Sequence, residues 1–122
     1  MFSTYREEKV ITSDGNIYLL QYASFTKKEV MEESVKKLSN YLLKIEDSKY
    51  YVYVGGSTNL ENANKVKNLL ENQGIYVYIK NDYIGNNEIV KKINKIDQEI
   101  IKSNDNTEIL RKNAEILEIL KK

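Results

Sequence analysis

Two stretches of the chain alternate between aliphatic and tyrosine side chains, a pattern typical of a strand with two different faces. They are Tyr50–Val54 (YYVYV) and Ile75–Lys80 (IYVYIK). Two further β-prone runs, Ile17–Ala23 and Leu42–Glu46, bring the number of predicted strands to four. Because side chains alternate faces along a strand, the valines and isoleucines should lie on one face of a sheet and the tyrosines on the other.

Two helices are predicted between these strands, each opened by a Thr-x-x-Glu capping box. Thr26 and Glu29 mark the start of the first helix, and Thr58 and Glu61 mark the start of the second. Apolar residues then follow at helical spacing: Met31, Val35, Leu38 and Leu42 in the first segment, and Ala63, Val66 and Leu70 in the second.

The chain contains an internal repeat of two strand–helix–strand halves. A shift of 32 residues places Thr26 on Thr58 and Leu38 on Leu70. Gly55–Gly56 is expected to end the third strand and Gly74 to end the second helix. Two such halves predict an α+β fold, a split β-α-β-β-α-β sandwich of the ferredoxin-like kind. Its four-stranded antiparallel sheet has both helices on one face and leaves the other face open.

The segment 86–122 follows a different pattern and is predicted to be a C-terminal helical extension. A narrow isoleucine stripe runs along a helix at 87–102, and a last helix begins near Thr107 with apolar residues on more than one side. Either this helical hairpin packs on the sandwich or on itself, or it is a coiled-coil or dimerisation element. The expected organisation is a linker or arm at 1–15, a domain at 16–83 and the extension at 86–122.

The strand alternation also predicts which side chains line the open face of the sheet. Val52 and Val54 should face the helices, and in the first strand Leu20 and Tyr22 should do the same. The open face is then expected to carry Tyr51, Tyr53, Tyr76 and Tyr78, together with Leu19, Gln21 and Ala23.

A tyrosine-lined face suits the binding of sugars. Tyrosine rings match the C–H face of a sugar, and the Gln21 amide can both donate to and accept from hydroxyl and N-acetyl groups. At about 0.5–1.5 kcal/mol per aromatic contact, binding should be weak and should depend on a repetitive polymer. Two alternatives remain: the tyrosines are only β-prone or are covered by the C-terminal helices, or the face stacks bases. With Lys44 and Lys80 as its only expected cations, the face favours no nucleic-acid partner.

Composition limits the chemistry of this chain. Its 122 residues, 41% hydrophobic and 30% charged, suit one globular domain, and its net charge of +1 does not favour nucleic acid. The chain has neither Cys nor His, which excludes the usual zinc sites, a thiolate nucleophile and a histidine proton carrier. We therefore expect a binding protein that is not an enzyme and has no metal or other cofactor. Carboxylate-pair, Ser-Lys and carboxylate-only metal chemistry are the remaining enzymatic alternatives. No run of about 20 apolar residues suggests a membrane span.

Three segments resemble the SPOR (sporulation-related repeat) domain family. Tyr18–Phe25 (YLLQYASF) resembles its Y-x-V-Q-x-G-S-F opening, and Tyr50–Ala63 resembles its Y-R-V-x-V-G-P-F-x-x-x-E-x-A segment. Gly74–Ile79 is similar to the closing G-Y-x-A-Y-V, so the resemblance covers about residues 16–80. The chain departs from the family at Ala23, Gly56 and Ser57, where Gly, Pro and Phe are usual, and at Tyr51, where relatives often carry Arg or Trp.

The resemblance implies a β-α-β-β-α-β fold that binds peptidoglycan glycan strands stripped of their stem peptides. It also implies a place in the cell envelope, at the division septum or the spore wall, with a membrane anchor or signal outside this chain. Family contact positions fall on Gln21 and Ser24. The expected glycan-binding residues are therefore Gln21, Ser24, Tyr51, Tyr53, Tyr76 and Tyr78. The alternative is a module for protein–protein interaction or dimerisation, in which the C-terminal helices bind the partner and the sheet is a scaffold.

Overall fold

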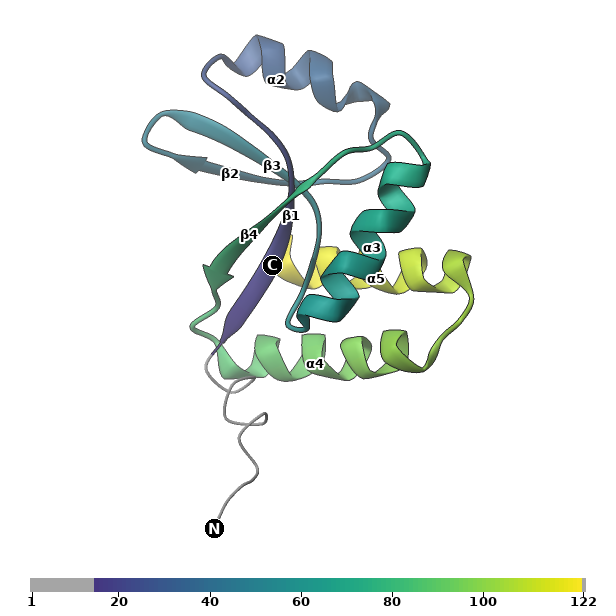
Figure 1. The fold of residues 1–122 in the computed structure, drawn as a ribbon. Coiled ribbons are helices and arrows are strands. Elements are labelled where there is room, and N and C mark those ends of the chain that lie inside the picture. Colours follow the sequence, from purple (N-terminus) through teal and green to yellow (C-terminus); the bar gives the residue numbers. More distant parts are fainter. Residues whose placement is uncertain (1–14, 122) are drawn as a thin grey trace.

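The computed structural model describes residues 15–121 and contains one four-stranded antiparallel sheet with four α-helices (Figure 1). The strands are β1 (Asn16–Phe25), β2 (Leu42–Glu46), β3 (Lys49–Ser57) and β4 (Tyr78–Tyr83), in the spatial order β2-β3-β1-β4. The helices are α2 (Lys28–Ser34) with the 3-10 turn η1 (Val35–Lys37), α3 (Leu60–Asn72), α4 (Asn87–Lys102) and α5 (Asn106–Lys121). The predicted α+β fold with a C-terminal helical pair is confirmed. The predicted arm at 1–15 lies, except for Gly15, outside the described residues.

Helices α2 and α3 pack on the valine side of the sheet, as the strand alternation predicts. Met31 and Val35 form a cluster with the fully buried Val52. Leu70 of α3 lies beside Val54, two residues further along β3. The strand alternation thus assigned Val52 to the correct face.

The C-terminal helices share the main core of the molecule. Ile93 and Ile100 of α4 and Ile116 and Leu117 of α5 are buried in the cluster that also contains Leu19 of β1. Figure 1 shows α4 and α5 side by side; they pack extensively on each other, and α5 also packs extensively on β3. Of the two arrangements considered for this segment, the structure has the packed hairpin.

Helix α5 takes the place of a missing strand beside β3. Strand β2 pairs only with residues 49–53, which leaves the backbone of residues 54–57 with a free edge. The Asn113 side-chain amide donates to the Val54 carbonyl at 3.4 Å and accepts from the Gly56 N–H at 3.2 Å. These are the groups that a neighbouring strand would satisfy, so one side chain stabilises an edge that would otherwise be unpaired.

The glycine pair that was predicted to end the third strand instead lies within β3. A Cβ atom on Gly56 would lie 3.1 Å from Leu120 and 3.2 Å from Leu19, and one on Gly55 would overlap the Asn113 side chain. Glycine here allows α5 to approach the strand closely.

Both early helices begin one residue later than their capping boxes predict. Their N-caps are Lys27 and Asn59, which still differ by the repeat length of 32 residues. The Asn59 side chain accepts from the Asn62 N–H at 2.9 Å, whereas Lys27 makes no side-chain cap bond. The Thr-x-x-Glu patterns therefore located the helices without forming the caps.

Two element ends also differ from the prediction. The first helix tightens into η1 after Ser34, so that Leu42 belongs to β2 and not to a helical stripe. Strand β4 begins at Tyr78 because the N–H groups of Gly74 and Ile75 still bond to carbonyls in the last turn of α3. Gly74 adopts a φ of 84°, as a helix-ending glycine does.

Candidate functional site

The strand register identifies the side chains on the face opposite α2 and α3. Gln21 pairs with Tyr53 on one side and with Tyr78 on the other, and Lys80 pairs with Leu19. Directly paired residues point to the same side of a sheet, so all five lie on this face. The prediction that Gln21, Tyr53 and Tyr78 share a face with Leu19 is correct.

The expectation that this whole face is open is wrong, because the last turn of α5 covers one end of it. Leu120 lies beside Ile17, Leu19 and Leu42, and these three β-strand side chains are buried. Tyr53 is also fully buried, with 0% of its surface exposed. Tyr53 is therefore on the predicted face but is not available as an exposed ring.

Two irregularities in the pairing of β1 with β3 change which residues reach this face near its other end. They flank Gln21 and leave Tyr22 without a partner on β3. Beyond them Ala23 pairs with Val52 on the helix side, so the prediction that Ala23 points outward is wrong. Ser24 pairs with Tyr51 instead and is exposed.

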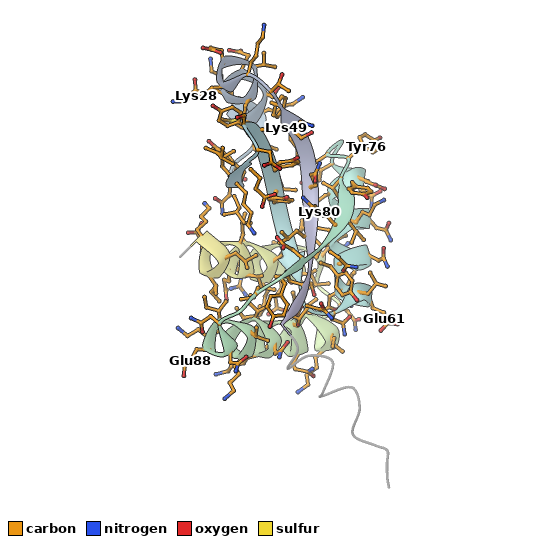
Figure 2. All side chains as sticks on the ribbon, turned by 90° about the vertical axis from the view of Figure 1, so that its left-hand side faces the viewer. Lys28, Lys49, Glu61, Tyr76, Lys80 and Glu88 are labelled. Atoms are coloured by element: carbon orange, nitrogen blue, oxygen red, sulfur yellow. The ribbon has the colours of Figure 1, made fainter. Side chains whose placement is uncertain are left out.

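The two tyrosines expected from the fourth strand are exposed but separate. Tyr78 begins β4, is 66% exposed and lies on the face with Gln21. Tyr76 precedes the strand and is 69% exposed. Figure 2 shows it on the side of the sheet where α3 lies, away from α5. The structure therefore does not place Tyr76 with the other predicted contact residues.

Among the residues that remain accessible on this face are five that we call the tyrosine–lysine surface: Gln21, Ser24, Tyr51, Tyr78 and Lys80. Sequence reasoning counted Lys80 among the cations of the face but gave it no role in the site. Its only sequence signal was its position two residues after Tyr78, on the same face of the strand.

Lys80 is held in place by two buried or half-buried tyrosines. Its Nζ donates to the Tyr53 hydroxyl at 3.1 Å and lies 4.5 Å from the centre of the Tyr51 ring. The hydrogen bond to Tyr53 raises the pKa of Lys80, and this effect outweighs that of partial burial. The ammonium group is therefore charged at any physiological pH. In Figure 2 Lys80 lies near the middle of the sheet.

The sheet curls so that its two outer strands approach each other over this face. Lys44 on β2 and Asp82 on β4 form an ion pair of 2.9 Å, although β3 and β1 lie between these strands. Figure 1 shows β4 crossing in front of β1. Next to the ion pair is a pocket of about 260 Å³ between the sheet and the ends of the C-terminal helices. The face is thus concave.

The Lys44–Asp82 ion pair should make stability depend on pH in the acid range. Burial raises the pKa of the Asp82 carboxyl, but the hydrogen bonds from Lys44 and from the Tyr83 N–H outweigh it and hold that pKa below its usual value. Because the folded pKa is the lower one, the stabilisation is present above about pH 4 and is lost as the pH falls further.

We expect Asp82→Asn to lower the free energy of unfolding by about 0.5–1 kcal/mol at pH 6, since the pair is partly exposed. As the pH falls through the lowered pKa of Asp82, the wild-type carboxyl becomes neutral too, and the difference should shrink. Urea titrations of both proteins across this range measure it. A difference that stays constant with pH would contradict the role given to the ion pair.

Two other kinds of site are not found in residues 15–121. No group of three or more Asp or Glu residues in this range is arranged to hold a metal ion. No helix in the same range is long and apolar enough to cross a membrane.

Comparison with known proteins adds one distant structural similarity. No protein-family profile matches the sequence, and no curated protein matches it. Among solved structures, the chain is similar to the peptidoglycan binding domain of the B. subtilis cell wall lytic enzyme CwlC, with 16% sequence identity and a TM-score of 0.46. The similar region covers 67% of this chain and 99% of that domain. The fold and the site described above rest on the residues of this chain.

Proposed function

We propose that this protein is a non-catalytic, SPOR-like module that binds peptidoglycan glycan strands from which the stem peptides have been removed. The binding site is the tyrosine–lysine surface. The observation that carries the proposal is the register of the sheet: it brings Gln21 next to the exposed Tyr78, and Ser24 next to Tyr51, on one concave face. The sequence resemblance of residues 16–80 to SPOR domains, which implies glycan contacts at Gln21 and Ser24, supports the same site.

The chemistry of these side chains suits an N-acetylated sugar polymer. The exposed ring of Tyr78 offers an apolar face to the C–H side of a sugar, and the Gln21 amide and Ser24 hydroxyl offer donors and acceptors to its polar edge. The part of the face that α5 leaves uncovered is concave, which suits an extended polymer. Few contacts per sugar imply weak binding that becomes useful when many sites lie along one strand.

The proposal places the protein in the cell envelope, at the division septum or the spore wall. No catalytic step is assigned to the surface. Lys44 and Asp82, the charged residues at its border, are paired with each other and form no acid–base pair aimed at a ligand.

Replacing Tyr78 by alanine is expected to weaken glycan binding about 2- to 10-fold, the loss of one good aromatic contact. Tyr83→Ala is the matched control, because Tyr83 ends the same strand with nearly equal exposure (65% against 66%) but alternates to the other face. The measurement is co-sedimentation with purified sacculi before and after amidase treatment. Wild-type protein should be enriched only on treated sacculi. Equal losses for the two variants, or no enrichment at all, would contradict the proposal.

The alternative function is partner binding through the C-terminal helices. It was suggested by their exposed-looking apolar residues, and the structure accounts for these residues in another way. Two strongly apolar helices needed a surface to cover them, and the sheet supplies that surface. Within the described part of these helices, Ile101 is the one large apolar side chain that is strongly exposed, at 46%.

A further inference from the structure

We propose that the tyrosine–lysine surface recognises a carboxylate on its ligand, and that Lys80 Nζ is the group that binds it. The inference deepens the proposed function and rests on it. When the amide bond to the stem peptide is hydrolysed, the lactyl group of each N-acetylmuramic acid is left with a free carboxylate. An intact strand has a neutral amide at the same place. A lysine at this site would therefore distinguish stripped strands from intact ones by charge.

The first support is that Lys80 has a fixed position but forms no ion pair with a carboxylate of residues 15–121, although Glu46 is near enough to attract it electrostatically. None of the ion pairs formed by residues 15–121 includes Lys80. Lys44, another lysine of this face, is neutralised by Asp82 at 2.9 Å. Lys80 and Lys49, which begins β3, are the two lysines of this face that no ion pair within the described residues neutralises, and Lys80 is the one held by Tyr53 and Tyr51.

The second support is that the ammonium group is already ordered. The buried Tyr53 hydroxyl accepts one of its three N–H donors, and the Tyr51 ring lies beneath it. Two donors are left for a ligand. Because Tyr53 already restrains the side chain, binding an anion costs less side-chain entropy than it would with a free surface lysine.

The third support is the position of Lys80 among the proposed contact residues. It follows Tyr78 by two residues on the same face, a separation of about 6.5–7 Å along the strand. That separation is comparable with the size of one sugar ring. A sugar stacked on Tyr78 can therefore direct a substituent toward Lys80, while its other edge faces Gln21.

The test compares two forms of one ligand. One form is the glycan oligosaccharide stripped of stem peptides. The other is the same oligosaccharide after chemical reduction of its lactyl carboxyl groups to primary alcohols. We expect the wild-type protein to bind the carboxylate form about 5- to 20-fold more tightly than the reduced form, the effect of one partly exposed charge-assisted hydrogen bond. Lys80→Gln should bind both forms with the same affinity, and that affinity should equal the affinity of the wild-type protein for the reduced form. Lys80→Arg should keep most of the preference.

Two further variants separate a local contact from general effects. Lys36→Gln removes the same charge from η1, on the opposite face of the sheet, and should leave the preference unchanged. Tyr53→Phe keeps the buried ring but removes the hydroxyl that positions Lys80. It should lower the carboxylate preference about 2- to 5-fold with little change for the reduced ligand. A loss of stability alone would change both affinities together.

The outcomes distinguish this inference from the proposed function. If wild-type protein and Lys80→Gln bind both ligand forms equally well, the glycan-binding function stands and the role of Lys80 is wrong. If wild-type protein binds neither form, the proposed function fails, and the inference fails with it.

Discussion

A chain that is cut after Gly85 is expected not to fold cooperatively, although it keeps all four strands and both helices of the predicted 16–83 domain. The cut removes α4 and α5, and with them the cover over Ile17 and Leu19. Burial of each such side chain is worth about 1.5–3 kcal/mol. Exposing several of these side chains would therefore cost an amount comparable with the 5–15 kcal/mol that typically stabilises a domain. The cut also removes Asn113 from the free edge of β3.

The measurement is a urea titration of the full and shortened chains, followed by far-UV circular dichroism. The full chain should give one sigmoidal transition, and the shortened chain a shallow curve without a folded baseline. A shortened chain with a sharp transition at a similar midpoint would show that the helical pair is an accessory. If the expected result is obtained, deleting the helices cannot serve as a test of partner binding, because the deletion also unfolds the sheet.

Asp97→Ala is expected to destabilise the protein by about 3–5 kcal/mol, the largest effect that we expect from a single substitution. The Asp97 carboxylate of α4 is only 2% exposed. It accepts from the Ser57 hydroxyl at 2.5 Å, from the Thr58 N–H at 2.9 Å and hydroxyl at 2.7 Å, and from the Asn62 amide at 2.9 Å. These groups form the junction of β3 and α3. Without the carboxylate, several buried donors lose a partner and α4 loses its polar attachment to the sheet.

Two comparison variants make this prediction specific. Asp97→Asn keeps the shape and one acceptor, so it should cost less, about 1–3 kcal/mol. Gln98→Ala changes the next residue of α4, which is exposed, and should stay within about 0.5 kcal/mol of the wild type. Chemical denaturation of the three variants gives the free energies. A cost below about 1 kcal/mol for Asp97→Ala would mean that the network contributes little.

The fold could be predicted from the sequence because its signals are local. Alternation of Val52 with Tyr51 and Tyr53 assigned each of these three side chains to its correct face. What alternation cannot say is whether a face is covered. Tyr53 and Leu19 are buried because α5 and Lys80 lie over that face. An apolar helical stripe shows that a helix is buried, but not against which surface.

The candidate site was harder to predict because it depends on register and on distant contacts. The irregular pairing around Tyr22 moves Ala23 to the helix side and brings Ser24 to the open side, and no local pattern in the sequence indicates it. Lys80 acquires its position from Tyr51 and Tyr53, 29 and 27 residues earlier in the chain. In the sequence, Asp97 looks like an ordinary charged residue on the solvated side of a helix. Its role becomes visible only in the structure, where α4 lies against Thr58.

The most direct test of glycan binding is a nuclear magnetic resonance titration of the ¹⁵N-labelled protein with stripped glycan oligosaccharides. The account predicts progressive shifts of the backbone amide signals of Gln21, Ser24, Tyr51, Tyr78 and Lys80, with the signals along α4 unchanged. If the shifts instead follow the outer side of α4 and α5, or if no signal moves at millimolar glycan, the tyrosine–lysine surface is not a glycan-binding site.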